Sequence, residues 1–118
     1  MHVRPAPVPG PNGTSRSLGD KLHDPVWTRL AEASIPVAFH LGDSGYHGRF
    51  ASAWGANDTF GFGRSDALGQ VVVSDRAIHD TVASLVVHGV FPRHPDLRVA
   101  SIENGSDWLH VDLLGTAA

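Results

Sequence analysis

The stretch Ile35-Pro36-Val37-Ala38-Phe39-His40-Leu41, which runs into Gly42-Asp43-Ser44-Gly45, decides the fold class that the sequence predicts. It is a continuous apolar run that carries two β-branched residues and ends at a turn signal. Such a run is typical of a strand that is buried on both faces, as in a parallel sheet covered by helices. Pro36 is tolerated because the first residues of a strand need few ladder hydrogen bonds. We therefore expect a buried parallel strand over residues 35–41.

Two further segments have the pattern of strands. Leu97-Arg98-Val99-Ala100-Ser101-Ile102-Glu103 is a second apolar run, which stops at Asn104-Gly105, and we expect it to be another buried strand. His2-Val3-Arg4 resembles the end of a strand. Alternating prolines over residues 5–11 then require extended or turn backbone, so this segment is either an irregular part of the fold or a disordered proline-rich tail.

Each gap between these strands contains a helix signal. Asp24 is a good N-cap with Pro25 at the first helical position, which predicts a helix over residues 25–33. A second helix begins after Asp75 and ends at Gly89, because apolar residues recur on one helical face between them. Pro92 and Pro95 are expected to prevent a new helix from starting after Gly89.

Two segments are less regular. Residues 46–74 are expected to be a long loop, in which Val71-Val72-Val73 is either a short strand or the lead into a helix. Ser106 or Asp107 caps a final helix that continues through Leu114. The alternation of strands and helices predicts an α/β fold with parallel strands and right-handed crossovers, and residues 1–118 form one unit of it.

The composition narrows the classes of function. The chain has 118 residues, a formal net charge of -3 and no cysteine, which excludes disulfides, thiol nucleophiles and cysteine-type zinc sites. Lys21 is the only lysine and no run of like charge occurs, so we expect no nucleic-acid partner. No stretch is apolar enough to span a membrane, and residues 1–5 lack a signal-like apolar region, so we expect a cytoplasmic protein.

Polar residues at the ends of the two buried strands are the candidates for chemistry, because working groups of parallel α/β folds gather there. His40 lies in an apolar run, where a hydrogen-bonded core histidine is the commoner interpretation. Glu103 ends a buried strand, so its carboxylate must be paired, bound to a metal or exposed at a solvent-filled mouth. The two side chains can share a divalent metal or act as acid and base. The histidines at positions 23, 47, 79, 88, 94 and 110 are expected on helix surfaces or in loops, without a role.

Four blocks of the chain resemble the amidohydrolase-2 family, which includes metal-dependent hydrolases and decarboxylases similar to aminocarboxymuconate-semialdehyde decarboxylase. They occur in the family's order and extend to about Leu109: Val3-Arg4-Pro5-Ala6-Pro7-Val8, His23-Asp24-Pro25-Val26-Trp27, Val37-Ala38-Phe39-His40 and Leu97 to Trp108. The resemblance implies a (β/α)₈ (TIM) barrel with one divalent metal ion, Zn²⁺ or Mn²⁺, at the mouth formed by the carboxyl ends of its strands.

The resemblance also implies roles for single residues. His40 matches the metal-ligand histidine at the end of the fifth barrel strand. Glu103 stands where many decarboxylase-like members carry a catalytic histidine, and it is the expected catalytic residue. The expected substrate-binding residues lie at the strand ends or on a loop over the mouth: Arg4, Asp43, Tyr46, Trp54 and Asn104.

The family's first-strand His-x-His ligands and eighth-strand aspartate have no counterpart in this chain. A barrel needs about 250 residues, so the sequence predicts a partial barrel, about half, from strand four to just after strand six. We expect a fragment of a hydrolase or decarboxylase for a small carboxylate or amide-like molecule, inactive by itself because catalytic metal sites use three or more protein ligands. The alternative is a non-enzymatic half-barrel that self-associates, as a homo-oligomer, or pairs with a complementary chain.

Overall fold

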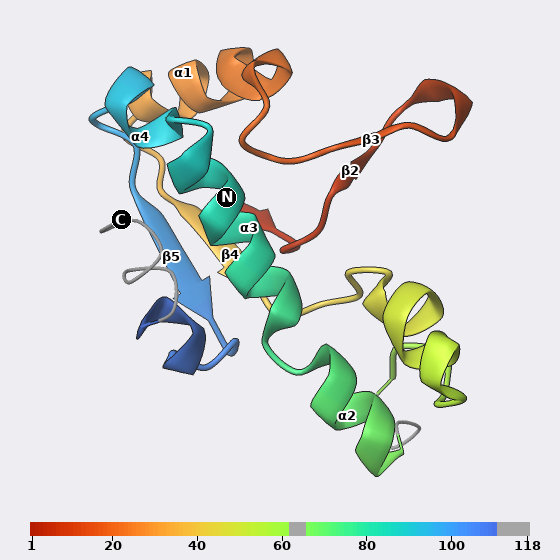
Figure 1. The fold of residues 1–118 in the computed structure, drawn as a ribbon. Coiled ribbons are helices and arrows are strands. Elements are labelled where there is room, and N and C mark those ends of the chain that lie inside the picture. The colour runs from red at the N-terminus through yellow and green to blue at the C-terminus, as the bar shows by residue number, and fades with distance from the viewer. Residues whose placement is uncertain (62–65, 111–118) are drawn as a thin grey trace.

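The fold is seen in a computed structural model that describes residues 1–61 and 66–110. The chain forms a small α/β structure in which short strands alternate with helices (Figure 1). In chain order the elements are β1 (His2–Val3), β2 (Val8–Pro9), η1 (Pro11–Gly13), β3 (Ser15–Arg16), η2 (Lys21–His23), α1 (Asp24–Glu32), β4 (Val37–His40), η3 (His47–Ala51), η4 (Ser52–Trp54), α2 (Ala67–Val73), α3 (Arg76–Val87), α4 (Val90–Arg93) and β5 (Val99–Ile102).

The central element is a three-stranded parallel sheet with the order β1-β4-β5. Val3 lies opposite Phe39, and Phe39 lies opposite Ser101, so the three strands end at nearly the same level. The predicted parallel α/β arrangement is confirmed. The strand predicted at residues 2–4 is also present as β1, which pairs with β4.

One face of the sheet forms the core with the helices. Val37 and Phe39 are fully buried there with Trp27 of α1 and with Ile78 and Leu85 of α3. In Figure 1 α3 lies in front of β4. Alternation along a strand places every second side chain on the same face, so these residues bury one face of β4 only.

The opposite face of the sheet is open, which corrects the prediction of strands buried on both faces. Along β4 buried and half-buried residues alternate, and Ala100 of β5 is exposed. His2 and Ala38 share this face with His40, since they lie opposite or two positions apart in the register. Among the described elements no second helix layer covers these side chains. The apolar run over residues 35–41 therefore led to an expected burial that is greater than the observed one.

The proline-rich segment is an ordered hairpin and not a tail. β2 and β3 pair antiparallel, and the hairpin extends away from the body of the molecule in Figure 1. Pro5 and Leu18, at its two ends, are buried. The hairpin is therefore held at its base, and the first of the two alternatives for this segment is correct.

The predicted long loop over residues 46–74 is wrong in part. It contains the helical turns η3 and η4 and the helix α2. Asp66 caps α2 by accepting a hydrogen bond from the Gly69 N–H at 2.6 Å, so Val71–Val73 belong to a helix. Sequence patterns did not predict these elements because each is short and none contains a full apolar period.

Three other helix predictions have different outcomes. The helix predicted over residues 25–33 is present as α1, but its N-cap is His23, because Asp24 already lies in the first turn of the helix. The helix predicted between Asp75 and Gly89 is present as α3. A helical turn, α4, does follow Gly89, contrary to the expectation for Pro92. Pro92 lies in the first turn of α4, where its missing N–H removes no helical hydrogen bond. The final helix begins at residues 107–110, and its predicted continuation lies outside the described residues.

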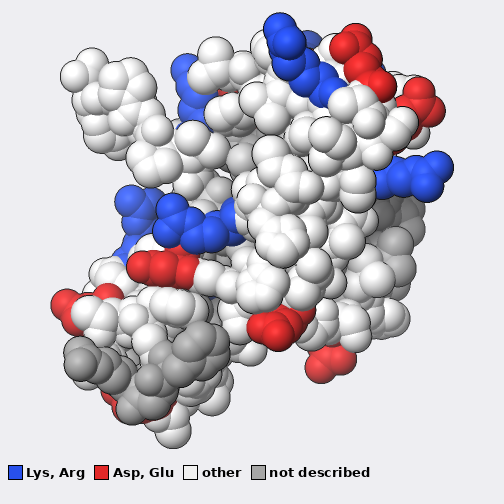
Figure 2. Space-filling model, turned by 180° about the vertical axis from the view of Figure 1, so that it is seen from behind, with Lys and Arg blue, Asp and Glu red and all other residues white. Residues whose placement is uncertain are grey.

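The molecule is less compact than its mass suggests. Its accessible surface is 7490 Å² and its radius of gyration is 15.0 Å. A compact monomer of this size exposes roughly 6200 Å² and has a radius of gyration of roughly 13.5 Å. Basic and acidic side chains are interspersed on the face shown in Figure 2. No helix in the described part of the chain is long and apolar enough to cross a membrane, and the cytoplasmic location stays a prediction.

Candidate active-site edge

The carboxyl ends of the three parallel strands bring His40 and Glu103 together. His40 is the last residue of β4 and Glu103 directly follows β5. The His40 Nε2 atom lies 3.6 Å from the Glu103 Oε2 atom, and 41% and 66% of the two side chains are exposed. Both residues lie at the strand ends where they were predicted, and the sheet register makes them neighbours across 63 residues of chain.

The orientation of the His40 ring follows from a backbone contact. Its Nδ1 atom lies 2.8 Å from the carbonyl oxygen of Leu41, which only accepts hydrogen bonds, so Nδ1 carries the proton. In the neutral ring Nε2 then presents a lone pair toward the Glu103 carboxylate. Two acceptors that face each other can hold a cation between them. The pair is therefore suited to acid–base chemistry or to ligation, as the sequence predicted from the residue types.

Glu103 reaches this position through an unusual backbone conformation. Its φ angle is 59°, in the left-handed region that residues other than glycine rarely adopt. The conformation ends β5 sharply and presents the carboxylate beside His40. Backbone strain of this kind is common at functional sites, where the surrounding structure holds it in place.

Asn104 holds the backbone beneath the pair. Its side chain is buried, and its Nδ2 atom donates to the carbonyl oxygens of Phe39 at 2.8 Å and Ile102 at 2.9 Å. These contacts link the ends of β4 and β5. Asn104, predicted to bind substrate, thus lies between the two strands, where its hydrogen bonds hold their ends in place.

Arg4 and Asp43 lie at the same edge. Arg4 directly follows β1, is exposed, and donates from Nη1 to the carbonyl oxygen of Asp43 at 3.3 Å. The Asp43 carboxylate accepts from the Gly45 N–H at 2.9 Å, which forms the turn after β4. Arg4 therefore presents a cation at the edge, whereas Asp43 shapes the loop.

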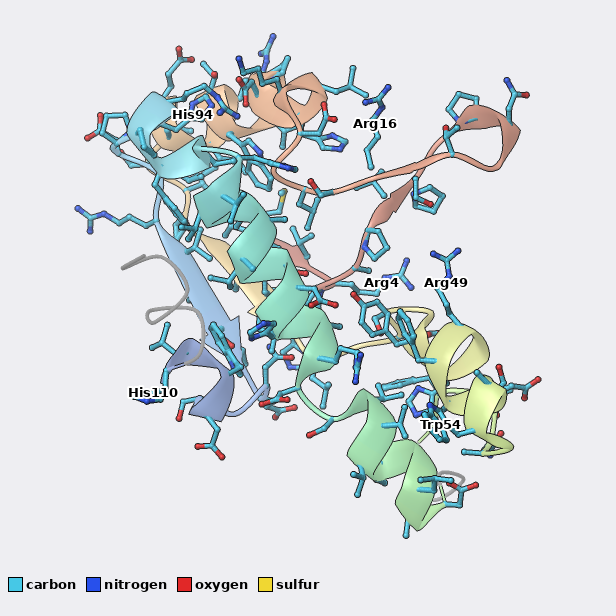
Figure 3. All side chains as sticks on the ribbon, viewed as in Figure 1. Arg4, Arg16, Arg49, Trp54, His94 and His110 are labelled. Atoms are coloured by element: carbon cyan, nitrogen blue, oxygen red, sulfur yellow. The ribbon has the colours of Figure 1, made fainter. Side chains whose placement is uncertain are left out.

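Tyr46 and Trp54 do not join this group. Tyr46 is buried, and its hydroxyl donates to the Asp80 carboxylate on α3 at 2.7 Å. Burial, followed by the Asp80 hydrogen bond and charge, raises the pKa of the Tyr46 phenol well above its usual value. Trp54 is 72% exposed, and in Figure 3 it lies at the right of the view whereas β5 lies at the left.

Several polar residues with clear structural positions were not singled out in the sequence. The His2 ring stacks on the His40 ring, with centroids 6.0 Å apart. In a strand, residues two positions apart point to the same face, so the spacing of His2 and Arg4 was the sequence signal that could have placed His2 at this edge. His47 and His94, expected in or beside loops, are buried or nearly so. Arg93 pairs with Asp24 through two hydrogen bonds of 2.9 Å, a contact between segments that no local pattern indicates.

The edge does not make a complete metal centre. His40 and Glu103 offer one nitrogen and one carboxylate, donors that Zn²⁺ and Mn²⁺ accept. Among residues 1–61 and 66–110, however, no group of three or more His, Asp or Glu side chains is arranged to hold a metal ion. The described residues thus supply only part of the ligand set of a metal ion.

Comparison with known proteins agrees with this partial site. A crystal structure of an amidohydrolase from Mycobacterium avium subsp. paratuberculosis K-10 is similar to the chain, with 57% sequence identity and a TM-score of 0.84. The similarity supports the amidohydrolase family. It covers 100% of this chain but only 29% of the solved amidohydrolase, so the chain spans less than a third of that protein's length. No family model and no curated protein matches the chain.

Proposed function

We propose that the chain supplies part of the active site of a metal-dependent amidohydrolase-type enzyme, a hydrolase or decarboxylase of small carboxylate or amide-like molecules. The observation that carries this proposal is the His40–Glu103 pair at the carboxyl edge of a parallel sheet, with Nε2 and Oε2 3.6 Å apart. The identity of 57% with an amidohydrolase over the whole chain supports it. The three-stranded sheet then corresponds to part of a (β/α)₈ barrel.

The chain's own residues have definite parts in this proposal. His40 acts as a ligand through Nε2, because its Nδ1 is committed to the Leu41 carbonyl. Glu103 accepts or donates a proton beside it, or serves as a further ligand. Arg4 offers a guanidinium group to a substrate carboxylate, which it can bind with two hydrogen bonds. A bound divalent metal would polarise the substrate or activate water.

Metal titration of the chain tests the ligand role. We expect Zn²⁺ to shift the His40 ring signals in NMR spectra and paramagnetic Mn²⁺ to broaden them, and we expect binding to weaken roughly tenfold in both His40→Ala and Glu103→Gln. His110→Ala, which changes an exposed histidine (labelled in Figure 3), serves as the matched control. Unchanged binding in His40→Ala would remove His40 from the proposal. We expect no turnover of small amides or carboxylates by the chain alone, so measurable metal-dependent turnover would contradict the partial site.

A hybrid enzyme tests the function directly. The 57% identity allows this chain to replace the matching 29% of the Mycobacterium amidohydrolase. We expect the hybrid to keep activity toward that enzyme's substrates and to lose it at least roughly 100-fold when His40→Ala is added. His110→Ala in the same hybrid should leave activity unchanged. A folded hybrid that is equally active with His40→Ala contradicts the proposed role.

A second candidate, a non-enzymatic module that pairs with a second copy of itself, is favoured by the open face of the sheet. Ala100 is exposed on this face, and Ala38 and His40 are only half-buried there, so a second copy can cover them. Sedimentation velocity over a range of concentrations tests this candidate. A self-associating module should become monomeric with Ala100→Glu on the open face, and Ala53→Glu, also exposed, should have no effect. A wild-type chain that is monomeric throughout would exclude it.

A further inference from the structure

A cavity of about 160 Å³ lies behind the candidate active-site edge, on the helical side of the loop that follows β4. Its walls come from that loop, from η3 and from α2 and α3, and they include Leu41, His47, Phe60, Ala77 and Ile78. Neither His40 nor Glu103 lines it. The cavity is therefore separate from the proposed catalytic pair, although the two share the loop after β4.

His47 is the unusual group in this wall. It is 8% exposed, and its ring meets the Phe60 ring edge to face at 5.9 Å. In the part of the chain that the structure describes, no hydrogen bond is made by either ring nitrogen of His47. Neither ring nitrogen is fully buried, so each is accessible to water or to a small ligand. Because His47 lines the cavity, an occupant can form a hydrogen bond with its ring.

The other polar side chains of the wall have less to offer an occupant. Asn104 donates to backbone carbonyls at the ends of the strands, and the Ser44 hydroxyl accepts from the Tyr46 N–H. Gln70 also takes part in an interaction within the chain. Among residues 1–61 and 66–110, no Lys, Arg, Asp or Glu lines the cavity. These residues offer no charged partner to an ionised ligand, which would lose its hydration on entry, so they favour a neutral ligand.

The size and the lining define the ligand further. A cavity of about 150 Å³ lined by aliphatic and aromatic side chains accommodates benzene. The present cavity is similar in volume and in most of its walls, and it adds one imidazole. We propose that it is a binding site for a neutral, single-ring aromatic molecule with one hydroxyl group, a phenol, whose hydroxyl forms a hydrogen bond with His47.

Binding of phenol and of benzene tests this proposal, because the two probes differ only in the hydroxyl group. We expect phenol to bind, to shift the His47 ring signals and the Ala77 methyl signal in NMR spectra, and to bind at least about fivefold more tightly than benzene. Absence of phenol binding, or equal affinity for the two probes, would overturn the proposal. Phenol binding without a shift at His47 would do so as well, since water would then be the only partner of the imidazole.

Three variants separate the hydroxyl contact from the cavity itself. His47→Phe keeps an aromatic ring and should weaken phenol binding at least about fivefold while benzene binding is kept. His47→Gln restores a hydrogen-bonding group and should recover part of the phenol affinity. Ala77→Leu fills the cavity and should abolish binding of both probes. If phenol binds His47→Phe as tightly as the wild type, the proposal is wrong. If a variant does not fold, the comparison of phenol and benzene binding to the wild-type chain still tests the proposal.

Discussion

At the scale of single residues, Glu103 combines a chemical group with a backbone conformation that opposes it. Its φ angle of 59° lies in the left-handed region, which costs a non-glycine residue roughly 1–2 kcal/mol. The carboxylate that results lies 3.6 Å from His40 and is mostly exposed. Glycine would avoid this cost at position 103, whereas glutamate supplies the carboxylate that the proposed function uses.

Substitutions of Glu103 separate the effect of its carboxylate from the effect of its left-handed backbone conformation. We expect Glu103→Gly to be more stable than Glu103→Ala by about 1 kcal/mol, because only glycine relieves the left-handed conformation and both changes remove the carboxylate. Urea denaturation measures the free energy of unfolding of the two variants. Equal stabilities would show that the backbone conformation at this position carries no strain.

Tyr46, the only tyrosine of the chain, gives a direct optical signal. Burial and the Asp80 carboxylate raise its pKa above the ordinary value of 10.0, so the folded chain keeps the phenol proton when an unfolded chain loses it. The free energy of unfolding should therefore fall as the pH rises above about 10. We expect no tyrosinate absorbance near pH 10 until the chain unfolds. A tyrosinate signal with an ordinary midpoint in the folded chain would show that the Asp80 contact is absent in solution, and Tyr46→Phe should lose the alkaline pH dependence.

At the scale of elements, the segment between β3 and η2 is packed directly on α3. A Cβ atom on Gly19 would lie 2.1 Å from the carbonyl oxygen of Ser84 and 2.7 Å from its carbonyl carbon. Both atoms belong to the α3 backbone, which cannot move without disturbing the helix. Close packing of backbone on backbone thus requires glycine at this position.

Gly19→Ala should accordingly destabilise the fold by about 3 kcal/mol, as overpacking of a close contact does. Gly48→Ala is the matched control, because its Cβ would meet only the carbonyl oxygen of Asp58 at an ordinary 3.6 Å. Gly48 lies in helical backbone, so this change should be neutral or stabilising by up to about 1 kcal/mol. Thermal unfolding of both variants checks the difference, and similar melting temperatures would contradict the close contact.

The same scale shows which elements the sequence could predict. α1 and α3 were predicted because caps and apolar periods are local signals, namely Asp24 with Pro25 at one helix and Asp75 with Gly89 at the other. α2 and η3 were missed because short helices depend on contacts with neighbouring segments more than on a pattern of their own. The open face of β4 was missed because an apolar run records hydrophobicity and not whether a partner layer is present.

At the scale of the whole molecule, the Arg93–Asp24 pair joins the first residue of α1 to the last residue of α4, 69 residues away. Arg93 also donates to the carbonyl oxygens of His88 and Gly19, so one guanidinium connects several segments. The Arg93 hydrogen bond, assisted by His94, holds the pKa of the Asp24 carboxyl below its ordinary value of 3.8. The pair thus contributes to global stability in a pH-dependent way.

The sign of that dependence is testable. An acid whose pKa is lowered by folding stabilises the fold above its unfolded value, and this contribution is lost as the pH falls below about 3.8. We expect the wild type to be about 1–2 kcal/mol more stable than Asp24→Asn at pH 7, with the gap closing in acid. Chemical denaturation across pH 2–7 measures the gap. A constant gap would show that the Asp24 charge is not what stabilises the pair.

Sequence by itself determined the parallel α/β class, the two principal helices and the placement of His40 and Glu103 at strand ends, because apolar periodicity, helix caps and glycine stops act over a few residues. Only the tertiary structure decided that the two side chains face each other across 3.6 Å, that Tyr46 turns to Asp80, and that one face of the sheet is open. These features depend on the register between β4 and β5 and on packing between segments far apart in the chain. Distances across such contacts are set by the whole fold, and no local pattern of residues encodes them.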